Sequence, residues 1–263
     1  MRLYVEVAKR AFQRQLAYRT ANLAGLVTNG CFGYLRGAVF VAVYQARENI
    51  AGYDVRDAIT YMWVVQALLM VVVLWGWWDV ESTIRSGDVV SDLSKPFSYL
   101  GFWLARDYGR ALYYVLFRGV PVFVVGQIMF GLRWPASSGT WLAFAASVVL
   151  AVAVSFAWRF IINLTAFWTT EARGLGQIAM AAVTVLSGFL VPIGYFPDAV
   201  QGVLVALPFA SMFQIPADVF LERLSGADLL LAIGRQAFWA ALLLAMAQLL
   251  VIRATRRVVV QGG

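Results

Sequence analysis

Hydrophobic and polar positions divide this 263-residue chain into long apolar runs separated by short charged segments. A helix needs about 20 apolar residues to cross the roughly 30 Å hydrocarbon core of a bilayer. The pattern therefore predicts an all-α integral membrane protein with a single transmembrane domain over residues 1–263. We expect six transmembrane helices, near residues 22–44, 58–78, 111–131, 140–168, 177–194 and 233–252.

The longest segment that cannot lie in a membrane is 79–110, between the second and third predicted spans. Within it, Ser86, Gly87 and Asp88 predict a helix end followed by a new helix start. Glycine accepts the left-handed conformation at a helix end, and Asp88 can cap the free amides of the next helix. The charged residues of the segment are Asp79, Glu81, Arg85, Asp88, Asp92, Lys95, Arg106, Asp107 and Arg110.

A short amphipathic helix is expected after this break. Val89, Leu93 and Phe97 recur at four-residue spacing on one face, and Pro96 ends the element. A compact helix that lies against a membrane protein by its apolar face can dock on a partner outside the bilayer. A solvated loop with balanced charge is the alternative.

The first 21 residues are rich in arginine and lysine, and their apolar positions recur at helical spacing. They predict a basic amphipathic helix in the cytoplasmic interface, with its apolar face in the acyl boundary. A signal peptide is the competing interpretation, but the apolar run 22–44 is longer than an h-region and no cleavage site follows it. The apolar positions are Leu3, Val7, Ala11 and Phe12.

Basic residues are distributed unequally between the two sides of the predicted spans, and cytoplasmic loops carry the excess of arginine and lysine. With both termini inside, the inner segments hold Arg2, Lys9, Arg10, Arg14, Arg19, Arg85, Lys95, Arg106, Arg110, Arg173, Arg253, Arg256 and Arg257. The outer segments hold Arg47, Arg56, Arg133 and Arg223. Segment 79–110 is therefore expected to face the cytoplasm.

The predicted outer region 195–232 has an unusual distribution of prolines. The apolar run 199–213 within it is too short to cross a bilayer and is bounded by prolines. Such a run predicts a re-entrant or interfacial helical pair, whose broken backbone must be covered by protein. An ordinary surface loop is the alternative. The prolines in and before this region are Pro192, Pro197, Pro208 and Pro216.

Composition excludes several classes of protein. With 62% hydrophobic residues, 13% charged residues and a mean hydropathy of +0.75, the chain lies outside the range of soluble domains. It has one cysteine, Cys31, and no histidine. A disulfide framework, a cysteine metal site and histidine-based metal or haem ligation are therefore excluded.

The order of these elements resembles that of a type-2 ATP-binding-cassette (ABC) exporter permease. The run Ile84-Arg85-Ser86-Gly87-Asp88 leading to Leu93-Ser94-Lys95-Pro96 is similar to the cytoplasmic loop of the viologen-exporter-like branch. Phe196-Pro197 and Leu207-Pro208-Phe209 resemble the outer-loop signature of the wider class. The resemblance covers the whole chain.

The resemblance implies a permease subunit that moves a hydrophobic or amphipathic substrate outward, as in multidrug efflux, across a bacterial inner membrane. It implies two copies of a separate ATPase subunit that bind ATP and Mg, a second permease chain in a homo- or heterodimer, contact with membrane lipid, and no nucleic acid. No cofactor is expected in this chain. A coupling helix seated on the ATPase is implied at Arg85, Gly87, Asp88, Val89, Asp92, Leu93, Lys95 and Pro96.

The chain itself lacks an ATPase motif. A Walker A loop needs Gly-Lys-Ser/Thr, whereas Lys9 follows Ala8 and Lys95 follows Ser94. The acidic residues form no recognisable catalytic constellation. We therefore expect no enzymatic activity in this chain.

Three arginines lie within the predicted spans, namely Arg36, Arg118 and Arg159, with no Asp, Glu or His expected at that depth. A carrier driven by protons or sodium is expected to bury such a group, so secondary transport is disfavoured. Arg118 and Arg159 are expected to extend to the head groups. Arg36 lies near the middle of its span and is expected to face a wet cavity, a backbone carbonyl, a partner subunit or an anionic lipid.

The resemblance also suggests which residues line a transport pathway, because the second and fifth spans usually lie between two permeases in this class. The candidates from these two spans are Tyr61, Gln66, Trp75, Thr184 and Ser187, and Arg36 of the first span is added as a cavity residue. A channel, or a non-transporting membrane subunit that anchors a soluble partner, is the alternative function.

Overall fold

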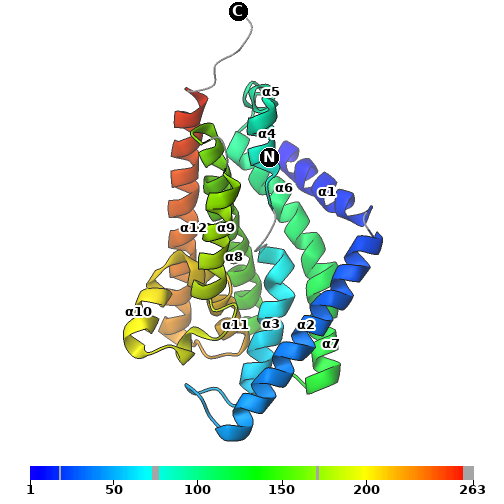
Figure 1. Cartoon of the computed structure of the whole chain (residues 1–263), viewed down its shortest axis with the longest axis vertical. Coiled ribbons are helices and arrows are strands. Elements are labelled where there is room, and N and C mark those ends of the chain that lie inside the picture. Colours follow the sequence, from blue (N-terminus) through cyan, green and yellow to red (C-terminus); the bar gives the residue numbers. More distant parts are fainter. Residues whose placement is uncertain (18, 73–76, 170–171, 257–263) are drawn as a thin grey trace, which may run out of the picture.

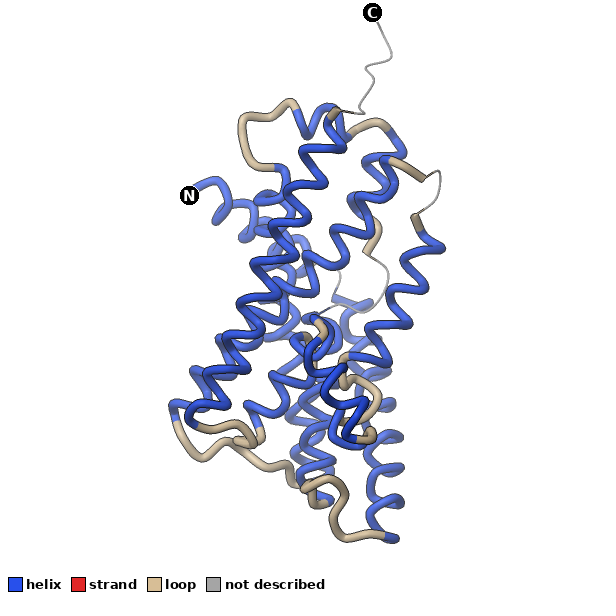
Figure 2. Tube along the Cα trace, turned by 90° about the vertical axis from the view of Figure 1, so that its left-hand side faces the viewer, coloured by secondary structure: helices blue, strands red, loops and turns tan. Residues whose placement is uncertain are grey.

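The computed structural model describes residues 1–17, 19–72, 77–169 and 172–256, and 81% of the chain is helical with no strand among these residues. Five helical segments are long and apolar enough to cross a membrane. Figure 1 shows them as a bundle, with α1, α4 and α5 at one end. In Figure 2, turned by 90°, the long helices run in a similar direction, and loops lie at both ends and around the short helices between them. The protein is therefore all-helical, as predicted.

The five candidate spans are Asn22–Ala46 in α2 (Arg19–Ala46), Val55–Val72 (α3), Tyr99–Phe130, Ser138–Phe167 and Gly226–Thr255 (α12). The third comprises α6 (Tyr99–Tyr114), a π-helical turn η1 (Val115–Gly119) and α7 (Val120–Phe130). The fourth comprises α8 (Ser138–Leu164) and the 3-10 turn η2 (Thr165–Phe167).

The third span is longer than predicted. Residues 99–110, expected in a loop, continue the helix of the span inward. The helix starts here because the Ser98 side chain accepts a hydrogen bond from the Gly101 amide (3.1 Å), and because Tyr99, Leu100 and Trp103 are buried on one face. The charged residues of this stretch masked the continuation in the sequence, although one of them, Asp107, lies on the same buried face.

The fifth predicted span, 177–194, contains only a 14-residue helix, α9 (Arg173–Leu186). At 1.5 Å per residue it is about 21 Å long, which is shorter than a hydrocarbon core. It ends where Gly188 adopts a positive φ of 82°. The count of six spans is therefore not confirmed.

The region after α9 consists of short helices. They are η3 (Ile193–Tyr195), α10 (Asp198–Ala206), η4 (Pro208–Ser211) and α11 (Gln214–Phe220). The apolar run 199–213 is thus broken at Leu207-Pro208 into two helical parts, as the prolines predict. Pro208 and Phe209 are buried, Phe196 and Leu207 are half-buried, and Pro197 is exposed.

The core of the bundle surrounds α3, most of whose side chains are buried, including Tyr61, Met62 and Trp63. Helices α2, α7, α8 and α11 all contact it. The end of the bundle that carries α4 has a second apolar cluster, in which Val80, Val89 and Trp103 are buried. The fold therefore positions α4 and α5 on a packed base.

The N-terminal helix α1 (Arg2–Leu16) packs against α6. Ala11 is buried, and the ring of Phe12 meets that of Tyr113 edge-on at 5.7 Å. The apolar face that was expected in the acyl boundary is therefore partly used against the protein, while Leu3 stays exposed.

Gly109 controls how closely α1 approaches α6, because a Cβ atom there would overlap the carbonyl oxygen of Ala8. We predict that Gly109→Ala separates the two helices and lowers the free energy of unfolding by about 1–3 kcal/mol, the usual cost of overpacking. Gly234→Ala in α12, where the added Cβ meets no atom within 4 Å, should instead be neutral or stabilising. Thermal unfolding in detergent distinguishes them; equal midpoints would contradict the close approach.

Candidate functional site

The α4–α5 corner, defined as residues 79–96, comprises α4 (Asp79–Ser86), a turn, α5 (Val89–Leu93) and the residues that follow it. Its start is fixed to the end of α8. The Glu81 amide donates a hydrogen bond to the Asn163 side-chain oxygen (2.9 Å), and the Asn163 amide group donates to the Trp77 carbonyl (3.1 Å). The Arg106 guanidinium pairs with the Asp79 carboxylate at 2.7 Å. The corner is therefore tied to both α6 and α8.

Glu81, in the first turn of α4, has a side chain that is fully buried between the corner and the rest of the protein. Its carboxylate is 3.2 Å from the Arg85 guanidinium and 3.8 Å from that of Arg173, at the start of α9. A buried carboxylate needs compensating charge, and these two arginines supply it. α4 and α9 are thus linked through one acid.

The turn between α4 and α5 confirms one expectation and corrects another. Gly87 has a φ of 82°, the left-handed conformation predicted for it. The Asp88 side chain, however, does not cap α5. Its carboxylate accepts a hydrogen bond from the Ser86 hydroxyl at 2.6 Å, so the side chain is held toward the preceding turn.

The predicted coupling residues divide into two sets. Val89 is buried and Leu93 is half-buried against the apolar cluster, as expected for the inner face of this helix. Asp92 is half-buried and pairs with Lys95 at 2.6 Å. The exposed set comprises Arg85, Gly87, Asp88, Lys95 and Pro96. Sequence reasoning missed Val90, which is 38% exposed beside them.

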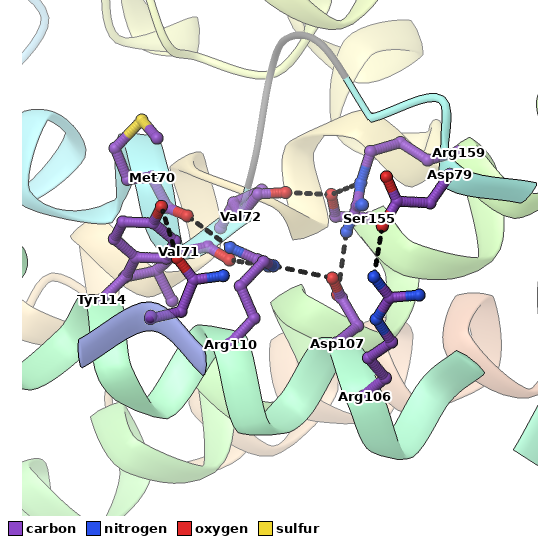
Figure 3. A network of polar contacts seen from close by, with 11 residues as sticks. Met70, Val71, Val72, Asp79, Arg106, Asp107, Arg110, Tyr114, Ser155 and Arg159 are labelled. Atoms are coloured by element: carbon purple, nitrogen blue, oxygen red, sulfur yellow. Dashed lines mark hydrogen bonds and ion pairs between the residues drawn. The ribbon is translucent and has the colours of Figure 1, made fainter. Parts of the chain in front are cut away.

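A polar network lies beneath the corner, at the carboxyl end of α3 (Figure 3). The Arg110 guanidinium donates to the carbonyls of Met70 (2.7 Å) and Val71 (2.8 Å). The Ser155 hydroxyl donates to the carbonyl of Val72. Helix ends leave such carbonyls without intrahelical partners, so α6 and α8 together cap α3.

Asp107 joins the two arginines of this network (Figure 3). Its carboxylate is 2.8 Å from Arg110 and 2.9 Å from Arg159, and all three side chains are nearly buried. Two expectations were therefore wrong. Arg159 does not extend to the head groups, and a carboxylate does lie within a candidate span. Since both oxygens of Asp107 accept from arginine, it forms a structural ion pair.

Arg36 and Gln66 meet at a cavity of about 440 Å³ between α2 and α3. Arg36 donates to the Gln66 side-chain oxygen at 2.9 Å, and to the carbonyls of Phe189 (2.5 Å) and Leu190 (3.0 Å). Gln66 in turn donates to Asn29. Of the partners expected for Arg36, the structure shows backbone carbonyls together with a cavity.

Arg118 also lines this cavity and is only 8% exposed, so its expected extension to the head groups is wrong. It lies in the π-helical turn η1, just before Pro121. A proline lacks the amide that an α-helix uses, and a π turn accommodates the break. The sequence signal was the proline three residues after the arginine.

The other described candidate pathway residues do not line this cavity, although Tyr61 and Ser187 both contact Gln214. Tyr61 is buried, and its hydroxyl lies 2.7 Å from the Gly188 carbonyl and 2.6 Å from the Gln214 side-chain oxygen. Ser187 is buried, and its carbonyl accepts from the Gln214 amide (3.1 Å). Thr184 is half-buried and donates to the Met180 carbonyl. Trp75 lies outside the described residues.

Gln214 and Asp218 of α11 organise the opposite end of the bundle. The Asp218 carboxylate accepts from the Tyr53 hydroxyl (2.9 Å) and the Gln214 amide group (2.8 Å), and the Arg223 guanidinium is 4.0 Å away. Burial raises the pKa of Asp218 to about 6, and the hydrogen bonds from Gln214 and Tyr53, with the charge of Arg223, limit the rise. We therefore expect the stability of this end of the protein to depend on pH.

Comparison with known proteins places most of the chain in a described family. The model of a family described as "ABC-2 family transporter protein" matches residues 36–262. No curated protein sequence matches the chain. The matched range includes α3 to α11 and the described part of α12, and it omits α1.

We predict that Asp107→Asn lowers the free energy of unfolding by about 3–5 kcal/mol, because it leaves two buried guanidinium groups without an anion. Asp79→Asn removes a carboxylate that is 47% exposed and should cost less than about 1 kcal/mol. Unfolding titrations in mixed micelles would measure both. Equal costs would mean that the buried ion pair does not stabilise the junction of α3, α6 and α8.

The raised pKa of Asp218 predicts a pH-dependent stability. An unfolded aspartate titrates near about 3.9, so between that pH and about 6 the folded protein binds more protons than the unfolded chain. Wild type should therefore gain stability relative to Asp218→Asn as the pH falls from 7.5 to 5, and the difference should be constant above pH 7.5.

Glu222 provides the control for this measurement, because it is exposed and its hydrogen bond from Thr140 lowers its pKa. The Glu222→Gln variant should keep the pH dependence of wild type. Thermal midpoints recorded from pH 5 to 8 would decide. A difference between wild type and Asp218→Asn that does not change with pH would rule out titration of this carboxyl.

Proposed function

The chain belongs to the ABC-2 transporter family, and from this we propose that it is the membrane half of an exporter, driven by a separate ATPase that docks on the α4–α5 corner. It is a multi-pass membrane protein and a permease subunit of an ABC transporter, and membrane subunits of this family are generally not catalytic. Membership in this family implies association with an ABC ATPase subunit.

One observation carries the docking proposal: an exposed polar corner rests on a rigid base. Gly87, Asp88 and Val90 point outward, while Val80 and Val89 are buried beneath them. Hydrogen bonds and ion pairs continue from this base into α6, α8 and α9. A displacement of the corner by a partner would therefore move several membrane helices together.

The six-span arrangement of the class is part of this proposal. α9 has exposed apolar residues, among them Ile178 (70%) and Val185 (48%), which suit contact with lipid or a second permease. We propose that α9 is a shortened fifth crossing, and that η3, α10 and α11 complete it as a re-entrant region. Two ATPase copies and a second permease, identical or different, would complete the transporter.

The direction of transport and the membrane in which the protein lies are also part of this proposal. With the arginine-rich end of the bundle in the cytoplasm, both termini would lie inside a bacterial inner membrane. The substrate would be hydrophobic or amphipathic and would move outward while ATP and Mg remain on the partner. The order of motifs in the corner supports the viologen-exporter-like branch, in which multidrug efflux is the expected role.

The corner is tested by Val90→Asp, assayed after co-expression with an ABC ATPase subunit that co-purifies with the wild-type chain. An unpaired carboxylate in the interface should reduce the amount of co-purified ATPase at least tenfold, and ATP hydrolysis in nanodiscs should fall with it. Val90 is preferred to Val89, because a charge at buried Val89 would disrupt the corner itself.

Val55→Asp is the matched control, because Val55 is 39% exposed and lies at the start of α3, at the opposite end of the bundle. This variant should retain the ATPase subunit. If Val90→Asp assembles normally, docking lies elsewhere. If wild type binds no ATPase, the alternative of a channel or a non-transporting anchor replaces the exporter.

A further inference from the structure

The cavity between α2 and α3 is lined by an unusual combination of side chains for a membrane protein. Its polar lining comes from Thr28, Asn29, Arg36, Gln66 and Arg118, and the rest of the lining is apolar or glycine. Both arginines belong to candidate spans. No acidic residue lines the cavity among the residues that the structure describes.

The two positive charges of the cavity are not neutralised. Arg36 donates only to uncharged oxygens, those of Gln66, Phe189 and Leu190. Arg118 makes no hydrogen bond or ion pair within the described part of the chain, and its buried Nε has no partner. Its guanidinium lies 5.7 Å from the ring of Tyr114. An unpaired charge is costly at such a position, so its presence indicates a binding role.

The position of Arg118 is built into the backbone. The π turn η1 before Pro121 carries its side chain, which lies nine-tenths buried against α2. Gly25 of α2 makes room for it, because a Cβ atom there would overlap the guanidinium. The turn thus places the guanidinium in this cavity, and the glycine leaves the space that the guanidinium occupies.

We propose that this cavity binds the anionic group of an amphiphile, a phosphate or carboxylate carried on an apolar chain. A guanidinium presents several N–H donors in a plane that matches both groups. Residues at the rim, including Phe32 (57% exposed) and Leu190 (45%), offer apolar surface to the chain. The same charges disfavour a lipophilic cation at this place.

The ligand has two sources, a resident anionic phospholipid or the transported substrate. The second source rests on the proposed function and gives the exporter a preference for anionic amphiphiles. The first does not, because binding to the cavity needs neither ATP nor an ATPase. Loss of docking at the α4–α5 corner would therefore leave the binding site intact.

The test is binding of dodecyl phosphate to the full chain in phosphatidylcholine nanodiscs, with dodecyltrimethylammonium as a cation of equal tail length. We expect saturable binding of dodecyl phosphate that the cation does not displace. Arg118→Gln should weaken binding at least tenfold. Arg253→Gln removes one exposed arginine from α12, across the bundle in Figure 1, and should bind like wild type.

An unfolding measurement shows whether a variant that loses binding is still folded. Because Arg118 has no ion pair or hydrogen bond with any residue that the structure describes, Arg118→Gln should unfold at or above the midpoint of wild type in phosphatidylcholine. Gly25→Ala, which pushes the guanidinium from its place, should also weaken binding while the charge is kept. Equal binding of cation and anion, or unchanged binding in Arg118→Gln, would overturn the proposal.

Two further experiments, a competition with phosphatidylglycerol and a measurement of ATP hydrolysis, distinguish a resident phospholipid from a transported substrate. If phospholipid is the ligand, phosphatidylglycerol added to the discs displaces dodecyl phosphate, and the ATPase rate of the complex does not respond to dodecyl phosphate. If the substrate is the ligand, dodecyl phosphate stimulates ATP hydrolysis in wild type and Arg253→Gln, and not in Arg118→Gln. Both results support an anion site. Stimulation that persists in Arg118→Gln contradicts it.

Discussion

The carboxyl end of α3 is the constraint on which the bundle depends. Its last described carbonyls, those of Met70, Val71 and Val72, accept hydrogen bonds from other helices, and an unpaired carbonyl in a membrane interior costs several kcal/mol. Arg110 from α6 and Ser155 from α8 satisfy these carbonyls. The arginine is itself balanced by Asp107, which also holds Arg159. Three helices therefore meet at one polar junction, and none can shift without exposing a charge or a carbonyl.

Two polar side chains farther along α3, Tyr61 and Gln66, also form hydrogen bonds with other parts of the chain inside an otherwise apolar core. Tyr61 contacts the turn after α9 and α11, and Gln66 contacts Asn29 and Arg36 of α2. Most buried polar groups need a hydrogen-bond partner. The partner of Tyr61 therefore favours α11 beside the first half of α3, and the partners of Gln66 favour α2 beside the second half. α3 lines the cavity directly, and the α4–α5 corner is tied to α6 and α8, which cap α3. A movement of α3 would therefore be felt at both.

Much of the fold follows from composition and spacing, because a run of about 20 apolar residues has few alternatives in a membrane. The left-handed turn at Gly87 and the break at Leu207-Pro208 were predictable for the same local reason, since few residues accept those backbone conformations. The short α9 was not predictable, because the apolar sequence continues after Gly188 ends the helix. The prediction put Asp107 in a loop because the residue is charged. Only the packing of α6 against α8 shows that Arg159 forms an ion pair with it.

The π turn at Val115–Gly119 divides the longest helical segment into two parts. Its i to i+5 hydrogen bonds take up one extra residue, so the turn is wider than its neighbours. α6, which carries Asp107 and Arg110, is locked to α3 and α8, whereas α7 packs against α2 and α3. The two helices therefore meet where the helical register changes, and the place of Arg118 in the cavity depends on how they join.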